Sequence, residues 1–485
     1  MNNLWDIKRE DIIEGVLAEF ARLAEIPRPS GHEKAVSDYL QGLFRSMGCR
    51  VQQDSVYNII ADMPATADCR DKPLAVMQAH MDMVCVADDK VEYDPLKDAI
   101  RLVLDGDSLH ADGTSLGADD GMGIAIIVYI MKNLSSHGPL RAVITTDEEC
   151  GMTGSMNLAN EVFDGVKYLI NCDAAEWDLL TVGSAGSGDI EFCCSYEAVA
   201  AREQGYCLKI SGLSGGHSGE KINCGIANSL KAMGHCLSGL REKAEGFRLS
   251  SINGGRAKNV IPSTAEAVFT CKSSLEEIQQ LVESEYKRFM GLYGDVEDKA
   301  CFAVAKADVA EVCGDESGER LIDLLLCLPS GVSAMSKLCQ DQVESSANIG
   351  VVETDAADHS FCVKYLPRSS REESILEYYD TARALSRNLG FELKLGHIFP
   401  SWTERKNSRL AEIMRGVFQE QNGQPMRVAT IHAGLECSWH LRHNPEMDVV
   451  SIGTNNNDIH SPKENLEIHT VPPQVLLIAE TLQRI

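Results

Sequence analysis

The sequence has little positive charge and no hydrophobic run long enough to cross a membrane. Its 485 residues include 45 Lys and Arg against 72 Asp and Glu, a formal net charge of −27. Nucleic acids and anionic membranes attract clustered Lys and Arg, so we expect neither as a partner. The longest apolar stretch, around Gly121–Met131, falls short of the roughly 20 residues that a spanning helix needs. Because Met1–Lys8 show no basic-then-apolar signal pattern, we expect the protein to stay in the cytoplasm.

The sequence also lacks the cysteine spacing of a disulfide framework or a zinc knuckle. Its 17 cysteines are odd in number and scattered. The adjacent pair Cys193-Cys194 is not the Cys-x-x-Cys of a zinc knuckle. Cys172 and Cys271 stand inside apolar stretches, where a reduced thiol behaves as a small hydrophobic group. We therefore expect free thiols in a reducing compartment.

Four short apolar segments end abruptly in polar residues. They are Leu74–Ala79, Leu140–Ile144, Tyr168–Cys172 and Asp448–Gly453. Helical patterns lie between several of them, for example over Gly121–Asn133. Strands alternating with helices predict an α/β fold with a mainly parallel sheet and helices on both faces. Sheets of this type bind ligands beyond the carboxyl ends of their strands.

The middle of the chain is predicted to be an inserted α+β domain. Asp173 and Asp448 are separated by far more chain than the dozen or so residues that a parallel crossover requires. We assign residues 183–395 to the insertion and residues 1–182 and 396–485 to the principal domain. The Gly-rich run Gly183–Gly188 is typical of a flexible linker. Within the insertion, we expect two strands and an amphipathic helix, at Tyr206–Ile210, Ala265–Cys271 and Leu275–Met290.

Histidines and carboxylates follow the predicted strands. His80 and Asp82 would share one face of a strand, so His80 could bind a metal while Asp82 holds its ring from behind. Asp119 and Asp120 stand at the start of a helix. They are either ordinary helix caps or a source of one carboxylate that bridges two metal ions.

The pair Glu148-Glu149 directly follows an apolar strand, where a turn could aim both side chains into one cavity. One of them would then bind a metal while the other takes a proton from water. Asp173 and His460 follow two further strands. Imidazole and carboxylate ligands suit zinc, cobalt or manganese. Two such ions, about 3.5–4 Å apart, could hold a water between them and polarise a carbonyl group.

Two further histidines lie in compact motifs. His217, in Ser214–Gly219, is either a loop residue or, if the inserted domain closes over the site, a group that stabilises an oxyanion. His432, in His432–Cys437, has no role that the residues by themselves indicate.

As an ordered set, these motifs resemble those of the co-catalytic di-zinc exopeptidases. The matching segments are Ala79–Val84, Leu116–Gly121, Asp147–Glu149, Asn171–Asp173, Gly215–Gly219 and the His460 loop. Ile431–Cys437 and Pro445–Gly453 are similar, more closely, to the bacterial aminoacyl-histidine dipeptidases, which split Xaa-His dipeptides such as carnosine. The similarity runs from about Trp5 to the end of the chain.

The resemblance implies a metallo-dipeptidase with two divalent ions, zinc first and cobalt or manganese as alternatives. The implied metal ligands are His80, Asp119, Glu149, Asp173 and His460, with Asp119 as the bridge. Glu148 resembles the general base that activates a metal-bridged water, and Asp82 the partner of His80. A related di-metal tripeptidase or N-acyl amino acid deacylase, and a non-enzymatic metal-binding protein, remain alternatives. Glu148 argues against the last of these, because binding alone needs only ligands.

The resemblance also implies that the inserted domain is a lid that contacts a small peptide substrate, and it leads us to expect a homodimer formed through this domain. The implied substrate contacts there are His217, Asn259 and Arg368, with Arg371 as an alternative to Arg368. Glu436, in the His432–Cys437 motif, is expected to contact substrate as well.

Overall fold

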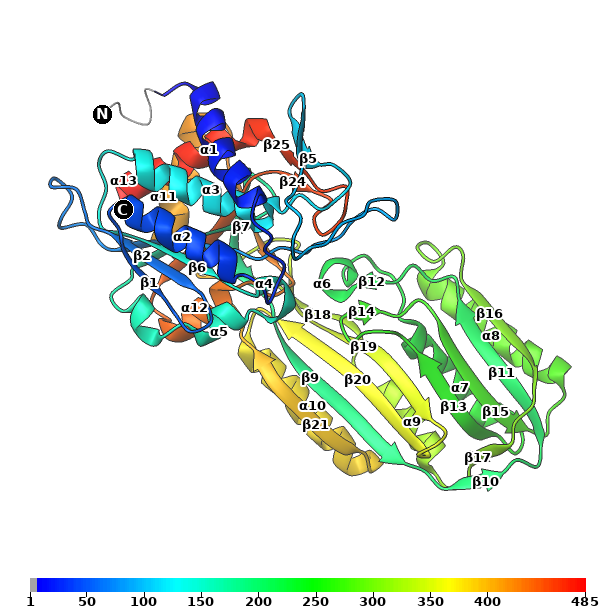
Figure 1. The fold of residues 1–485 in the computed structure, drawn as a ribbon. Coiled ribbons are helices and arrows are strands. Elements are labelled where there is room, and N and C mark those ends of the chain that lie inside the picture. The colour runs from blue at the N-terminus through cyan, green and yellow to red at the C-terminus, as the bar shows by residue number, and fades with distance from the viewer. Residues whose placement is uncertain (1–6) are drawn as a thin grey trace. The chain divides into compact units, whose positions relative to one another are not determined.

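The computed structural model describes residues 7–485 (Figure 1). Residues 1–6, which carry most of the segment examined for an export signal and the start of the family resemblance, lie outside this range. The chain forms two compact units. Unit 1 comprises Met1–Gly183, Glu404–Ala429 and Leu435–Ile485, and unit 2 comprises Ser184–Thr403 and Thr430–Gly434. Along the described residues, no helix has the length and apolar character to cross a membrane.

Unit 1 is built on an eight-stranded sheet in the order β1-β2-β6-β3-β7-β23-β8-β22. The strands are β1 (Arg50–Gln53), β2 (Ile59–Met63), β3 (Ala75–His80), β6 (Leu140–Thr145), β7 (Tyr168–Ala174), β8 (Leu179–Ser184), β22 (Arg427–Ile431) and β23 (Asp448–Gly453). The four strands predicted from the sequence, β6, β3, β7 and β23, form its parallel centre. At the edges, β1, β2 and β8 pair antiparallel, which the apolar pattern did not predict.

Helices cover both faces of this sheet, as predicted (Figure 1). One face is covered by α1 (Arg9–Ala24), α2 (Lys34–Ser46), α3 (Ala118–Asn133), α11 (Arg409–Asn422) and α13 (Val471–Arg484), and the other by α5 (Thr153–Asn157) and α12 (Cys437–His443). Helix α3 is buried from Gly121 to Met131, because its sequence is apolar on every side. The short helix α4 (Glu148–Gly151) follows β6. A separate small sheet contains β4 (Leu102–Asp105), β5 (Ser108–Ala111), β24 (Asn456–Asn457) and β25 (Asn465–Glu467).

Unit 2 is built on an antiparallel nine-stranded sheet with its own apolar core. The strands are β9 (Gly186–Ser195), β11 (Gln204–Ser211), β13 (Arg248–Gly254), β15 (Ala265–Cys271), β16 (Cys301–Ala307), β18 (Gly331–Met335), β19 (Val343–Asp355), β20 (Ser360–Ser369) and β21 (Glu392–Phe399). The main helices are α7 (Ser229–Lys243), α8 (Leu275–Tyr293), α9 (Ser317–Cys327) and α10 (Glu372–Leu389), with a short α6 (Ser218–Lys221). The predicted strands and helix inside the insertion correspond to β11, β15 and α8.

Unit 2 extends beyond the predicted end of the insertion at residue 395. Strand β21 pairs with β9 through Phe399, so the chain leaves the unit 2 sheet later than the composition suggested. The segment Thr430–Gly434 joins the same unit. The Ala185 N–H donates to the carbonyl oxygens of Ile431 and Ala433, which explains why this segment packs there.

The Gly-rich run Gly183–Gly188 is not the flexible linker that its composition predicted. Strand β8 ends at Ser184 and β9 begins at Gly186, and Ala185 between them is buried. A Cβ atom at Gly186 would lie 2.4 Å from the Phe399 carbonyl oxygen, and one at Gly188 would lie 2.6 Å from the Tyr379 ring. These glycines therefore allow close packing in a sheet rather than freedom of motion.

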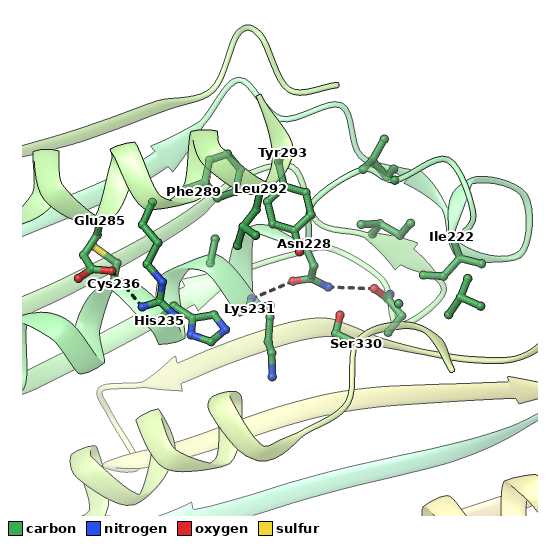
Figure 2. A pocket seen from close by; sticks show the side chains of 18 of the residues that line it. Ile222, Asn228, Lys231, His235, Cys236, Glu285, Phe289, Leu292, Tyr293 and Ser330 are labelled. Carbon is green, nitrogen blue, oxygen red and sulfur yellow. Dashed lines mark hydrogen bonds and ion pairs between the residues drawn. The ribbon is translucent and has the colours of Figure 1, made fainter. Parts of the chain in front are cut away.

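Unit 2 also contains a cavity of about 400 Å³ between α7, α8 and β18 (Figure 2). Phe289, Leu292 and Tyr293 of α8 give it an apolar wall. Lys231 of α7 also lines it, but its ammonium group donates to three carbonyl oxygens at the end of α9. The lining includes none of the residues that the sequence singled out for chemistry.

Candidate metal centre

The predicted ligands meet at the carboxyl edge of the parallel strands in unit 1. His80 is the last residue of β3, and Asp173 lies near the end of β7. Glu149 belongs to α4, directly after β6, and Asp119 lies in the first turn of α3. His460 lies in the loop between β24 and β25. Parallel strands end at the same edge of a sheet, so side chains that are far apart in the sequence come together there.

These five side chains and Glu148 form three overlapping groups. In each group, one potential ligand atom per residue lies within 4.8 Å of the others. The groups are His80–Asp119–Asp173, His80–Glu148–Glu149 and Asp119–Glu149–His460. Asp119 stands in the middle, with Oδ1 3.1 Å from His80 Nε2 and Oδ2 3.2 Å from His460 Nε2. A carboxylate that directs its two oxygens toward different imidazoles has the geometry of a ligand shared by two ions.

The centre holds more carboxyl groups than its two imidazoles can neutralise. Burial raises the pKa of Glu148 well above its usual range, although the nearby His80 opposes the shift. Burial also raises the pKa of Asp173, and the neighbouring Asp119 adds to this effect. Carboxyl groups with raised pKa values are held where their negative charge is poorly compensated. A cation among them would supply that compensation.

The pKa values of Asp119 and His460 are shifted in favour of the charged forms, whereas those of Glu148 and Asp173 are shifted in favour of the neutral forms. Although burial opposes ionisation of Asp119, its hydrogen bonds with His460 and His80 hold its pKa well below the usual range. Hydrogen bonds with Asp119 and Glu149 raise the pKa of His460 to about 10. The carboxylates that favour the protonated form of His460 are the same ones that would share a metal ion with it. The donor set, imidazole nitrogens with carboxylate oxygens, fits zinc, cobalt or manganese.

Asp82 contacts His80 on the ring nitrogen that faces away from Asp119 and also binds the backbone of Glu148 and Glu149. The sequence placed it in the same strand as His80, but β3 ends at His80 and Asp82 lies beyond it. Its Oδ1 lies 3.5 Å from His80 Nδ1. It also accepts the backbone N–H groups of Glu148 at 3.0 Å and Glu149 at 3.2 Å, and the Ser30 hydroxyl at 2.7 Å. Despite burial, His80 and these donors lower the pKa of Asp82 to about 2. One ionised carboxylate therefore orients an imidazole and both glutamates.

Ser30 could not be predicted from the sequence, because its hydroxyl reaches Asp82 from a distant loop. Glu436 does not lie where a substrate contact was expected. Glu436 is fully buried and accepts hydrogen bonds from Gln78 at 2.5 Å, Thr145 at 2.8 Å and Ser155 at 2.5 Å. No part of this side chain is exposed to a substrate, so the structure contradicts the predicted contact. Glu436 instead joins β3 to β6 beneath the centre.

The remaining predicted residues lie in unit 2. Strand β12 (Gly216–His217) pairs with β14 (Val260–Ile261), which brings His217 next to the Asn259 segment. The Ser218 N–H donates to the Asn259 carbonyl at 2.8 Å, and Arg368 Nε donates to the Ser218 hydroxyl at 3.4 Å. His217, Asn259 and Arg368 therefore surround Ser218. Arg371, the alternative to Arg368, is paired with Glu344 at 2.9 Å.

Arg368 is 8% exposed, yet within residues 7–485 no carboxylate lies within ion-pairing distance of it. Beside it, His432 donates to or accepts from the Ser346 hydroxyl at 2.6 Å. Burial and the charge of Arg368 lower the pKa of His432 to about 3 and also lower that of His217. We call His217, Ser218, Ser346, Arg368 and His432 the arginine cluster. It combines a buried cation with neutral donors, which is the chemistry of an anion site.

Comparisons with known proteins extend over nearly the whole chain. The model of peptidase family M20/M25/M40 matches residues 76–484. The cytosol non-specific dipeptidase of Escherichia coli (strain K12) is 32% identical over 500 aligned positions, covering 99% of this chain and 97% of that protein. The crystal structure of aminoacylhistidine dipeptidase from Vibrio alginolyticus has a TM-score of 0.90 at 29% identity, covering 97% of this chain and 96% of that one. Aminopeptidase PepT from Bacillus cereus has the same fold, with a TM-score of 0.56 at 13% identity over 97% of this chain and 98% of its own.

Proposed function

The chain belongs to peptidase family M20/M25/M40, and we propose that it hydrolyses dipeptides with the help of two divalent metal ions. Family membership confirms the resemblance found in the order of the motifs. The observation that carries the proposal is the position of Asp119 between His80 and His460, with two further carboxylates and Glu148 around them. The names of the Escherichia coli and Vibrio relatives support dipeptides as the substrate class.

We assign the metal ligands as predicted. The two ions would be held by five side chains, with Asp119 shared between them: His80, Asp119, Glu149, Asp173 and His460. When bound, such ions polarise a carbonyl group and lower the pKa of water. We propose zinc as the metal, with cobalt and manganese as alternatives of the same ligand preference.

Glu148 is proposed as the general base. It lies beside the ligands Glu149 and His80, but the other five side chains suffice for two ions. Its raised pKa suits a carboxyl group that takes a proton from the attacking water and then gives it to the leaving nitrogen. The hydrogen bond from the Glu148 N–H to Asp82 fixes the backbone that carries it.

The arginine cluster is proposed as the site for the carboxylate of the substrate. A dipeptide has a free carboxylate, and Arg368 is a buried guanidinium group that lacks an anionic partner among the described residues. His217 and Asn259 are proposed as further substrate contacts, and His217 also as a donor to the oxyanion. In this proposal unit 1 is the catalytic domain and unit 2 the lid.

Xaa-His dipeptides such as carnosine are the substrates that we propose first. The relatives differ in name on this point, since one is a non-specific dipeptidase and the other an aminoacylhistidine dipeptidase. We also propose a cytoplasmic location, supported by the name of the Escherichia coli relative, and a homodimer through unit 2. Light scattering of the purified protein tests the dimer.

The test is metal analysis combined with a substrate panel, before and after chelation. The panel contains carnosine, other Xaa-His dipeptides, dipeptides without histidine, tripeptides and N-acyl amino acids. We expect two ions per chain and dipeptide hydrolysis that chelation abolishes and zinc, cobalt or manganese restores. Hydrolysis of only tripeptides or N-acyl amino acids would replace the proposal with a related amide hydrolase. Two bound ions without any turnover would indicate a non-enzymatic metal-binding protein.

A further inference from the structure

The loop that carries Asp119 is bound by a single buried carboxylate. Glu464 is 2% exposed and lies outside the ligand set. Its Oε2 accepts the N–H groups of Leu116 at 2.8 Å and Gly117 at 2.9 Å, and its Oε1 accepts those of Ala118 at 2.9 Å and Asp119 at 3.3 Å. Four consecutive backbone donors thus point at one side chain, and charge-assisted hydrogen bonds of this kind are stronger than neutral ones.

A buried cation holds the same loop from the carbonyl side. Arg28 is 2% exposed, and its Nη2 donates to the Gly117 carbonyl at 2.5 Å. Its Nη1 donates to the carbonyl oxygens of Met81 at 3.0 Å and Asp82 at 3.2 Å. Arg28 therefore joins the segment after His80 to the segment before Asp119.

Gly117 is the residue where the two charges act together. Glu464 binds its N–H, while Arg28 binds its carbonyl. Gly117 has a left-handed backbone with φ +69°, and a Cβ atom there would lie 2.7 Å from Arg28 Nη2 and 2.5 Å from Met83 Sδ. Only glycine allows the arginine and the loop to approach so closely.

Glu464 also belongs to the segment that carries the second histidine. His460 precedes it in the same loop, and the Glu464 N–H donates to the Ser461 carbonyl at 3.1 Å. The Asn456 side chain donates to Glu464 Oε1 at 3.1 Å. One carboxylate thus connects the His460 loop with the loop of Asp119, and these two ligands are 3.2 Å apart at their nearest atoms.

We propose that Glu464 and Arg28 are positioning residues that fix the spacing of Asp119 from His460 and from His80. They act through the backbone of the two ligand loops and bind neither metal nor substrate. The inference rests on the proposed function in one respect, namely that Asp119 and His460 share an ion. Partners that orient metal ligands typically contribute about 10–100-fold to metal affinity.

The test compares Glu464→Gln with Glu467→Gln. Glu467 lies in the same part of the chain and also accepts side-chain hydrogen bonds, from Asn455 at 2.8 Å and Asn457 at 3.3 Å, but it does not bind the Asp119 loop. Zinc affinity is measured by competition with a chromophoric chelator, and kcat is measured as a function of zinc concentration. We expect Glu464→Gln to weaken one of the two ions by about 10–100-fold and to recover most of its kcat at saturating zinc. Glu467→Gln should match the parent.

Unchanged zinc affinity in Glu464→Gln, with only a lower melting temperature of the metal-free protein, would overturn the inference. If circular dichroism shows that this variant does not fold, Glu464→Asp and Arg28→Lys replace it, since each keeps its charge but loses contacts. Both should show a smaller loss of zinc affinity of the same kind, and parent-like affinity in both would also overturn the inference. Zinc binding is read without turnover, so an inactive parent would refute the proposed function without deciding this test.

Discussion

The metal centre of unit 1 and the arginine cluster of unit 2 contain similar residues but have opposite electrostatic requirements. In unit 1, carboxyl groups outnumber the imidazoles, and burial raises the pKa of Asp173 and Glu148. In unit 2, Arg368 is buried beside imidazoles, and no acidic group within residues 7–485 pairs with it. An uncompensated buried charge is costly, so each cluster favours a ligand of the opposite sign. The first suits metal cations, and the second suits a carboxylate.

The histidines of the two clusters show the same contrast. Hydrogen bonds with Asp119 and Glu149 raise the pKa of His460 to about 10. Burial and Arg368 lower the pKa of His432 to about 3. At neutral pH, His460 carries a proton that a metal ion would displace, whereas His432 is neutral. The side chain is the same in both clusters, and its neighbours decide its charge. Carboxylates favour the charged form of His460, whereas burial and Arg368 favour the neutral form of His432.

The largest effect is expected from Glu148→Gln in the metal centre, where it should lower kcat. Glutamine keeps the shape of the side chain but cannot take a proton, and general acid–base catalysis typically contributes about 10²–10⁴-fold. We expect kcat to fall by that factor while both metal ions stay bound, as measured by steady-state kinetics and metal analysis. Glu412→Gln, on the surface of α11, is the control. A kcat near that of the parent would remove Glu148 as the base.

The next largest effect is expected from metal removal, which should affect the metal centre of unit 1 but not the arginine cluster of unit 2. Chelation leaves the carboxylates of unit 1 uncompensated, whereas the arginine cluster has no metal to lose. A ligand whose free concentration is 100 times its dissociation constant stabilises the folded protein by about 2.7 kcal/mol. We therefore expect chelation to lower the melting temperature of the parent, and zinc to restore it. Asp119→Asn should show a much smaller response to chelation and zinc. A parent-sized response in Asp119→Asn would contradict the shared-ligand assignment.

A smaller and more selective effect is expected in unit 2. Hydrogen bonds to charged groups contribute about 1.5–3 kcal/mol, so Arg368→Gln should lower kcat/KM for dipeptides by about 10–150-fold. Dipeptide amides, which lack the carboxylate, should be affected far less. Arg371→Gln is the matched control, because Arg371 is paired with Glu344. Equal losses for acids and amides would show that Arg368 does not bind the carboxylate.

The smallest effect is expected on the free energy of unfolding at acid pH, through His440 of unit 1. His440 is fully buried against Phe163, and burial lowers its pKa to about 3. The unfolded chain, with a histidine pKa of about 6.5, then binds more protons than the folded one between about pH 3 and 6.5. Stability should therefore fall as the pH falls through this window. From pH 7.0 to 5.5 this histidine alone accounts for about 1 kcal/mol.

His440→Phe should reduce that acid sensitivity by the same amount, measured by urea unfolding of the metal-free protein at both pH values. Phenylalanine preserves the ring that packs on Phe163. His443→Phe is a control in the same helix, because His443 contacts the same ring but is only partly buried and its Nδ1 is hydrogen-bonded to Asn160. An unchanged difference between the two pH values in His440→Phe would show that this histidine is not buried in its neutral form.

Four of the five proposed metal ligands could be singled out in the sequence because they follow a recognisable strand, whereas Asp119 stands at the start of a helix. An apolar run that ends in polar residues is a local pattern, and parallel strands end at one edge. His80, Asp173 and the Glu148-Glu149 pair could therefore be placed together before any contact was known. The role of Glu436 could not, because Gln78, Thr145 and Ser155 reach it from separate elements and leave no common spacing in the sequence.

The amino-acid sequence alone determined the α/β class, the four central strands and the side chains at their ends, because periodicity and order along the chain are local properties. Only the tertiary structure decided that Gly186 and Gly188 pack in a sheet and that Glu464 binds the Asp119 loop. It also decided that, among residues 7–485, Arg371 has an acidic partner and Arg368 has none. These outcomes depend on hydrogen bonds and charges between residues that are distant in the chain. Such contacts exist only after folding, when burial removes water as the competing partner.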